Sequence, residues 1–152
     1  PLYSSAASDV YKRQLNICKE ALKKGRELDL MPLTVTVVDV AGVIRASLSE
    51  EGSGLIRSDI AYAKAWTCLA FNVSSNTLRD VFEGQPRLAP AVTGMQTMAG
   101  GKLVPTPGGM LIQKDGKNIG AVGVTGDVSD QDEICAISGI ESSNLTPGHK
   151  SI

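Results

Sequence analysis

Residues 110–125, MLIQKDGKNIGAVGVT, decide the fold because they have the pattern of one β-hairpin. Met110 to Lys114 is a short apolar run, Asp115-Gly116 is a hairpin-turn signal, and Asn118 to Thr125 is the returning strand. The returning strand is small and apolar almost throughout, so we expect both of its faces to be buried. The glycines inside it predict that another backbone packs directly against it.

A second hairpin precedes this one in the chain. Leu33 to Asp39 reads LTVTVVD and is rich in β-branched residues, Val40-Ala41-Gly42 is a turn, and Val43 to Leu48 is the returning strand. Leu103 to Pro107 offers a further short strand. Hairpins in sequence order predict a mainly antiparallel sheet flanked by helices, which is an α/β fold of the α+β type.

Four segments have helical patterns. The second begins after Ser58, a residue typical of an N-cap, and the last begins at Ser129 with Asp132 in a capping-box arrangement. Glu83 to Gly101 has no clear period, so we expect it to be irregular and either functional or mobile. The expected helices are Leu15–Leu28, Ile60–Phe71, Asn76–Phe82 and Ser129 to about Leu145, where Pro147-Gly148 follows.

Composition excludes several classes of protein. The chain has 152 residues and a net charge of −1, which fits one globular domain and offers no basic block for nucleic acid or an anionic membrane. No stretch is long enough for a membrane span and no signal core is present, so we expect a cytoplasmic protein. The three cysteines, Cys18, Cys68 and Cys135, form no CxxC pair and are expected to be buried core residues in a reducing compartment.

The start of the chain is unlike the rest. Ser4 to Gln14 reads SSAASDVYKRQ and resembles the in-frame translation of a transposase sequencing adapter. We therefore interpret residues 1–14 as an artefactual segment of a metagenomic fragment and exclude them from functional reasoning. The expected organisation is then a single domain over residues 15–146, followed by a C-terminal tail over residues 147–152.

Two blocks of the sequence, residues 32–71 and 108–139, resemble the GlcG/HbpS haem-binding family, which includes the C-terminal domain of PduO-type proteins. The first block carries the I-A-x-x-K-A core as IAYAKA at 60–65. The second carries a glycine pair at 108–109, a D-G hairpin and an acidic Q-D-E helix start at 131–133. Two departures are Leu111, where the family usually has proline, and SEEG at 49–52 in place of R-M-D-G.

The resemblance implies a profilin-like fold, self-association into dimers or larger oligomers, and haem binding or haem degradation in some members. Our first hypothesis is therefore a protein that binds haem or another tetrapyrrole as its cofactor or ligand. A second is an accessory protein or enzyme of hydroxy-acid (glycolate) or corrinoid/propanediol metabolism, and a third is a structural oligomer without a small ligand. The resemblance leaves open whether the protein is an enzyme, and it assigns no catalytic residue.

Candidate ligand-binding residues lie at the start of the helix in the first block. Arg57, Asp59 and Lys64 surround a helix N-terminus, which suits an anion, and Arg57 is able to clamp a carboxylate such as a haem propionate. Lys64 points either into a cavity or along the surface to water. The alternative is an ordinary capped helix end with its charges in solvent.

The second candidate site is Thr106-Pro107-Gly108-Gly109, whose glycines would let backbone N–H groups approach a ligand. Its alternative is a kink between strands. We expect a cavity between the helix and the glycine pair to hold a small acidic or tetrapyrrole ligand.

Iron ligands are scarce in this sequence. His149, the sole histidine, is more typical of a solvated tail residue, and Met95 and Met98 are more typical of core filling. The acidic run at Asp127, Asp130, Asp132 and Glu133 allows a metal site, since Asp130 and Glu133 can share a helix face. A favourable charge at a helix start explains the same residues, so no metal site is predicted.

Overall fold

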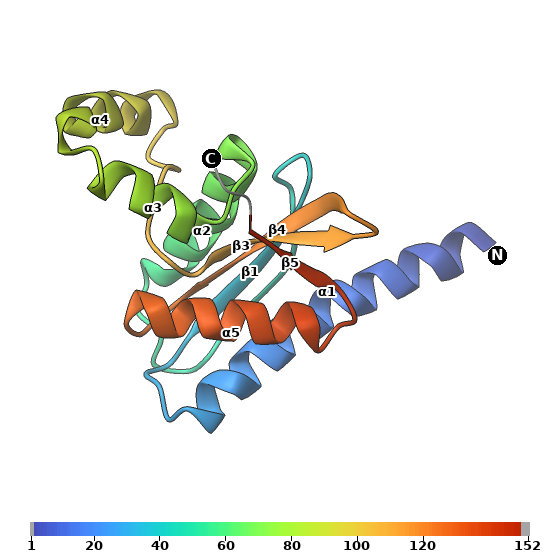
Figure 1. Cartoon of the computed structure of the whole chain (residues 1–152). Coiled ribbons are helices and arrows are strands. Elements are labelled where there is room, and N and C mark those ends of the chain that lie inside the picture. Colours follow the sequence, from blue (N-terminus) through green and yellow to red (C-terminus); the bar gives the residue numbers. More distant parts are fainter. Residues whose placement is uncertain (1, 150–152) are drawn as a thin grey trace.

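The computed structural model describes residues 2–149, with side chains from residue 9 onward. It contains five α-helices and a five-stranded sheet, and confirms the predicted α+β class (Figure 1). In chain order the elements are α1 (Leu2–Glu27), β1 (Thr34–Asp39), β2 (Ile44–Ser49), α2 (Arg57–Phe71), α3 (Ser75–Glu83), the 3-10 helix η1 (Pro86–Leu88), α4 (Ala89–Met98), β3 (Gly109–Lys114), β4 (Lys117–Thr125), α5 (Ser129–Glu141) and β5 (Thr146–Gly148).

The sheet has the strand order β2-β1-β4-β3-β5, and every neighbouring pair is antiparallel. Both predicted hairpins, β1–β2 and β3–β4, are present. The central strand β4 is buried from Gly120 to Thr125, as its small apolar sequence predicts. A Cβ at Gly123 would lie 1.9 Å from the carbonyl oxygen of Ala61 in α2, so glycine is required there for the helix to cross the strand.

Helices cover both faces of the sheet (Figure 1). On one face α1 and α5 pack over a core that includes Val35, Val37, Met110 and Val122. A Cβ at Gly139 in α5 would lie 2.6 Å from the carbonyl oxygen of Ile17, which shows how closely α5 approaches α1. On the other face α2 packs over a smaller cluster, made of Val38, Ala65, Cys68, Leu111 and Ala121.

The three cysteines are free and buried, which confirms their interpretation as core residues. Burial raises the pKa of the Cys18 and Cys68 thiols to about 12 and that of Cys135 to about 11. Such thiols are protonated near neutral pH and are poor nucleophiles.

After α1, the helix boundaries differ most from the predicted ones at the start of α2 and at the end of α5. Helix α2 begins at Arg57, with Ile56 at its N-cap position and no side-chain cap, so Ser58 lies inside the helix. Helix α5 ends at Glu141 rather than near Leu145. The residues that follow form the edge strand β5, which pairs with β3 and was not predicted, because a three-residue strand containing Pro147 and Gly148 carries no alternating pattern.

The segments around α4 also differ from expectation. Residues 103–107 form no strand; Leu103 instead packs with Val73 and Leu78 in a separate small cluster. The stretch from Glu83 to Gly101, predicted to be irregular, contains η1 and α4. Helix α1 is continuous from Leu2 to Glu27, so the adapter-like segment is helical, and its natural or artefactual origin stays a prediction.

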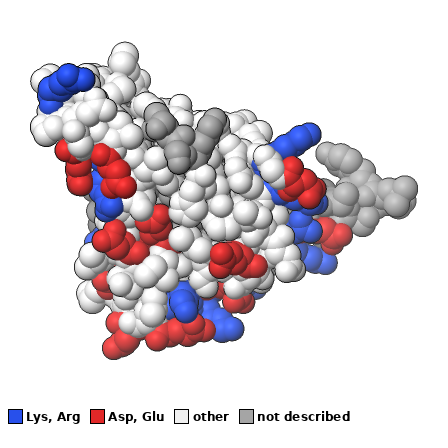
Figure 2. Space-filling model, viewed as in Figure 1, with Lys and Arg blue, Asp and Glu red and all other residues white. Residues whose placement is uncertain are grey.

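None of the described helices combines the length and the apolar character that crossing a membrane requires. On the face that Figure 2 shows, acidic and basic side chains are interspersed rather than gathered into one field.

Candidate functional site

The structure brings Lys64 and the Gly108-Gly109 pair together, but it fills the space between them. The side chain of Lys64 is 3% exposed. Its Nζ donates to Asp132 Oδ2 at 3.1 Å and to the carbonyl oxygen of Val124 at 3.0 Å. Burial lowers the pKa of Lys64 and raises that of Asp132, while the charge of each partly offsets the effect of burial on the other. The two residues form a buried ion pair that joins α2 to α5.

Gly108 and Gly109 are held against α2 without a gap. A Cβ at Gly108 would lie 2.9 Å from Lys64 Nζ, and one at Gly109 would lie 2.8 Å from Cys68 Sγ. Ser75 Oγ accepts a hydrogen bond from the Gly109 N–H at 2.8 Å and donates to its carbonyl oxygen at 3.2 Å. The described residues therefore leave no cavity between the helix and the glycine pair. The backbone at Gly108 and Gly109 packs directly against α2, and only glycine permits this close approach.

Of the remaining predicted ligand residues, Arg57 lies close enough to the Lys64–Asp132 pair for its charge to lower the pKa of both, whereas the others lie apart from it. The guanidinium of Arg57 donates to Thr125 Oγ1 at 2.9 Å, Asp59 is exposed, Thr106 is half-buried and Pro107 is buried. These residues do not converge on a shared hollow in the part of the chain described, and their ligand-binding role stays a prediction. His149 is exposed, and the described residues contain no cluster of three or more His, Cys, Asp or Glu side chains placed for a metal.

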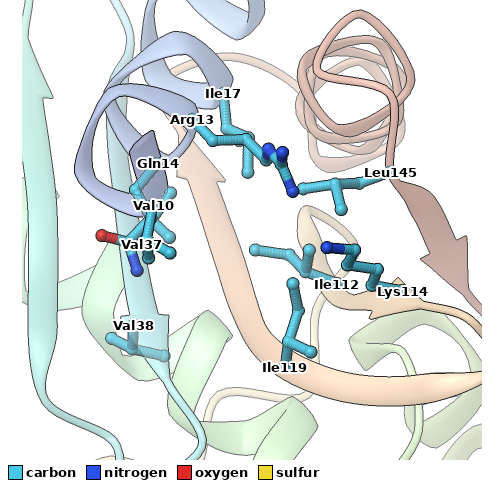
Figure 3. A pocket seen from close by; sticks show the side chains of 10 residues that line it. All are labelled: Val10, Arg13, Gln14, Ile17, Val37, Val38, Ile112, Lys114, Ile119 and Leu145. Atoms are coloured by element: carbon cyan, nitrogen blue, oxygen red, sulfur yellow. The ribbon is translucent and has the colours of Figure 1, made fainter. Parts of the chain in front are cut away.

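A different hollow lies on the opposite face of the sheet. This pocket, which we call the α1 pocket, has a volume of about 240 Å³ and lies between α1, the strands β1, β3 and β4, and the residue before β5 (Figure 3). Its lining consists of Val10, Arg13, Gln14, Ile17, Val37, Val38, Ile112, Lys114, Ile119 and Leu145.

The α1 pocket exists because α1 reaches further across the sheet than α5 does. The N-terminal part of α1 projects past the sheet, whereas α5 ends at Glu141 and the chain turns into β5 (Figure 1). The strand registers also slip here, between Val37 and Val38 and between Ile112 and Gln113. The extra residues at these slips are Arg45 of β2 and Ile119 of β4, and Ile119 is one of the residues that line the pocket.

The lining has a simple chemical character. Seven of its ten residues are aliphatic, and the only two charged ones, Arg13 and Lys114, are both cationic. Figure 3 shows their terminal nitrogens turned toward the same space, between Leu145 and Ile112. An apolar pocket with a few placed polar groups is the usual form of a small-molecule site, and cations at its rim favour a carboxylate. The arrangement suits a ligand with an apolar body and an acidic edge.

Reasoning from the sequence missed this pocket for a physical reason. Val10, Arg13 and Gln14 lie in the segment set aside as adapter-like. The remaining lining residues are Ile17 of α1 and residues spread over three strands and a loop. The available signal was weak: Lys114 lies directly before the Asp115-Gly116 turn, where a lysine is ordinary.

Fold and topology define the chain as an α+β protein with an open antiparallel sheet between helical layers. It belongs to the HbpS-like family, since the family model described as "Haem degrading protein HbpS-like" matches residues 12–141.

Two kinds of relative are similar to this chain. Over 129 residues it is 30% identical to the corrinoid adenosyltransferase PduO of Salmonella typhimurium, covering 85% of this chain but 37% of that protein. Among solved structures it resembles a PduOC:heme complex, with 29% identity, a TM-score of 0.78 and coverage of 89% of this chain and 94% of the other. A double mutant of Streptomyces reticuli HbpS has 24% identity and a TM-score of 0.73, covering 87% and 84% of the two chains, and shows the shared fold.

Proposed function

We propose that the protein binds haem or a related tetrapyrrole in the α1 pocket. The observation that carries this proposal is an aliphatic lining with the cation Lys114 and no acidic residue. Arg13 adds a second cation, but it lies in the segment interpreted as adapter-derived, so the proposal rests on Lys114. A porphyrin has an apolar ring and two carboxylates, so its ring would contact Val37 and Ile112 while a carboxylate meets Lys114. Membership of the HbpS-like family and similarity to a PduOC:heme complex support the choice of ligand.

The residues fit the ring and its carboxylates better than they fit its iron. Pockets that enclose a whole ligand measure about 300–1,000 Å³, and the α1 pocket is smaller at about 240 Å³. We therefore propose that the tetrapyrrole is partly enclosed, with its acidic edge outward. Haem iron is usually bound by His, Met, Cys or Tyr, and none of these types lines the pocket among the described residues. The proposal is accordingly one of binding, and no oxidative step is assigned to the protein.

Titration with haem tests the proposal, using the Soret band as the readout. Substituting Lys114→Glu replaces an attraction for the carboxylate with a repulsion. A hydrogen bond to a charged group contributes about 1.5–3 kcal/mol, so we expect affinity to fall by at least about 10-fold. Lys117→Glu is the matched control, because this lysine is exposed in the same hairpin but does not line the pocket. Absence of any spectral change at micromolar protein and haem would contradict the proposal, as would equal losses in the two variants.

The ligand residues expected from the sequence provide an alternative location. We keep Arg57, Asp59, Lys64, Thr106, Pro107, Gly108 and Gly109 as a proposed anion site at the start of α2. The Arg57→Ala variant separates it from the α1 pocket: loss of haem binding in this variant, with Lys114→Glu unaffected, would favour the α2 site.

The similarity to PduO favours a second candidate function, as an accessory domain in corrinoid metabolism. The chain spans little more than a third of that relative, 37% of its length, so the activity of the whole relative is not carried over. Calorimetric titration with cobalamin, and with glycolate for the hydroxy-acid hypothesis, distinguishes these functions from haem binding. Heat released with either ligand but no Soret change with haem would favour the second candidate.

A further inference from the structure

Three loops meet at one end of the sheet and expose large apolar side chains there (Figure 1). They are the segment after α1 (residues 28–33), the segment between β2 and α2 (residues 50–56) and the turn before α5 (residues 126–128). Apolar side chains scattered singly over a surface are ordinary, but a group of them marks a contact with another molecule. We call this region the three-loop surface, and its largely exposed apolar residues are Met31 (64%), Leu55 (100%), Ile56 (63%) and Val128 (67%).

The three loops are fastened to one another. The Met31 N–H donates to Asp127 Oδ2 at 2.7 Å, which joins the first loop to the third. Glu50 accepts a hydrogen bond from the Leu33 N–H at 3.0 Å and pairs with Arg26 Nε at 3.0 Å, which joins the second loop to the first and to the end of α1. The surface is therefore preformed, so a partner binds it with little loss of conformational entropy.

The three-loop surface also carries a surplus of negative charge. Residues 26–32, 50–59 and 126–130 contain seven carboxylates and two arginines, in a chain whose net charge is only −1. Both arginines already have partners: Arg26 forms the ion pair described above, and Arg57 donates to a threonine of β4 at 2.9 Å. Asp29 and Glu51, in contrast, are exposed and form no ion pair with any described residue.

This combination of charge and apolar side chains disfavours several kinds of partner. Nucleic acid and anionic membranes are polyanions, which the carboxylates repel. A wholly apolar partner would remove Asp29 and Glu51 from water without supplying an opposite charge. A basic partner without apolar groups would leave Leu55 and Ile56 in water. A surface that presents apolar side chains flanked by Lys or Arg complements both features.

We propose that the three-loop surface docks a basic amphipathic segment of another protein. The apolar side chains of that segment contact Leu55 and Ile56, and its cations lie beside Asp29 and Glu51. The three-loop surface lies at the opposite end of the sheet from the α1 pocket, whose lining includes the end of β3 and the first half of β4. The docking is therefore independent of haem binding.

Fluorescence anisotropy with a labelled probe peptide tests the docking surface. The probe is an amphipathic helix of leucine and lysine, and a serine–lysine peptide and a leucine–glutamate peptide are its controls. We expect the wild-type chain to bind the leucine–lysine peptide most tightly, and its affinity to fall as salt is added. Binding of either control peptide as tightly as the probe, or no binding of the probe at high micromolar protein, would overturn the proposal.

Substituting Leu55→Ser and Ile56→Ser together removes the apolar contact without changing the charge. Because burial of aliphatic side chains is a main source of affinity, we expect the probe to bind at least about 10-fold more weakly. Val43→Ser with Ile44→Ser is the matched control, since these neighbours are also exposed, at 51% and 52%, but lie in the β1–β2 hairpin at the other end of the sheet. Circular dichroism checks that each variant is folded. Equal losses in the two variants would contradict the proposed contact.

Substituting Asp29→Asn and Glu51→Gln tests the charge separately. Asn suits the left-handed backbone of Asp29, whose φ is 55°, so the loop conformation is kept. We expect affinity for the probe to fall by at least about 2-fold and its salt dependence to become shallower. Asp115→Asn with Glu141→Gln is the control, because both residues are exposed outside the three-loop surface and Asp115 also has a positive φ, of 52°. A salt dependence that stays unchanged in the Asp29 and Glu51 variant would count against the proposal.

Two other occupants of the surface give different results. Anionic vesicles that retain the wild-type chain but not the Leu55→Ser/Ile56→Ser variant would identify a membrane. A sedimentation coefficient that rises with concentration in the wild type, but not in this variant, would identify a second copy of the chain. Either result would overturn the assignment of a basic protein partner.

Discussion

The buried ion pair between Lys64 and Asp132 allows a sharp test of how the two helical layers are joined. Substituting Lys64→Met keeps most of the side-chain volume but removes the ammonium that bonds Asp132 and the Val124 carbonyl. Removing one partner of a buried pair costs about 3–5 kcal/mol, because the other charge is left without compensation. A domain of this size has a total stability of about 5–15 kcal/mol, so the loss is a large part of it.

Urea unfolding followed by circular dichroism measures this loss directly. The corresponding fall in melting temperature is about 6–20 °C. Lys19→Met is the control, because Lys19 is exposed on α1 and its substitution is expected to change stability by less than about 0.5 kcal/mol. The double variant Lys64→Met/Asp132→Leu removes both charges and is expected to recover most of the loss, since an apolar replacement of a buried pair is often neutral.

The loss in Lys64→Met also has a defined dependence on pH. Burial raises the pKa of Asp132, so the folded state holds that proton more tightly than the unfolded chain does. In the variant, protonated Asp132 destabilises the fold least below the ordinary aspartate pKa of about 3.9. The free energy of unfolding then decreases as the pH rises toward the raised pKa of Asp132 in the folded state. We expect the cost of the substitution to be smaller near pH 4 than at pH 7. A cost below about 1 kcal/mol at pH 7, or one that grows as the pH falls, would refute the reasoning.

Two further outcomes follow from the packing. Gly123→Ala places a Cβ 1.9 Å from the Ala61 carbonyl oxygen, so urea unfolding is expected to show a loss of stability of about 1–3 kcal/mol or more. Gly94→Ala is the control: its Cβ would have nothing within 4 Å, and the substitution is expected to be neutral or stabilising. Equal effects of the two substitutions would show that α2 does not cross β4 so closely. The buried thiols, with the pKa of Cys68 raised to about 12, are expected to react with a disulfide reagent at pH 8 only after unfolding, and fast reaction of the native protein would contradict their burial.

The hairpins and the major helices were predictable because each produces a local pattern. β1 and β4 are dense in β-branched or small apolar residues, and the Asp115-Gly116 turn fixes a hairpin by backbone conformation alone. Helix α4 was not predictable because it has no buried face. Such a helix has no apolar stripe, so its sequence shows no helical period.

The candidate site was predicted only in part. The sequence singled out Lys64 and, separately, the acidic run containing Asp132, but these residues are 68 positions apart and only the tertiary structure pairs them. The glycine pair at Gly108 and Gly109 was interpreted as an opening for a ligand, whereas it permits dense packing. Both interpretations require glycine, so the sequence alone does not separate them.

The two edges of the described sheet differ in their capacity to recruit additional strands. On the β5 side the outer strand is three residues long, and its central Pro147 has no backbone N–H to offer. On the β2 side the outer strand runs for six residues and carries the charged side chain of Arg45, which disfavours an incoming apolar strand. Pairing with additional strands, as occurs in amyloid, is therefore disfavoured at both edges of the sheet. The protein exposes the apolar helix α4, but its strands offer no template for aggregation.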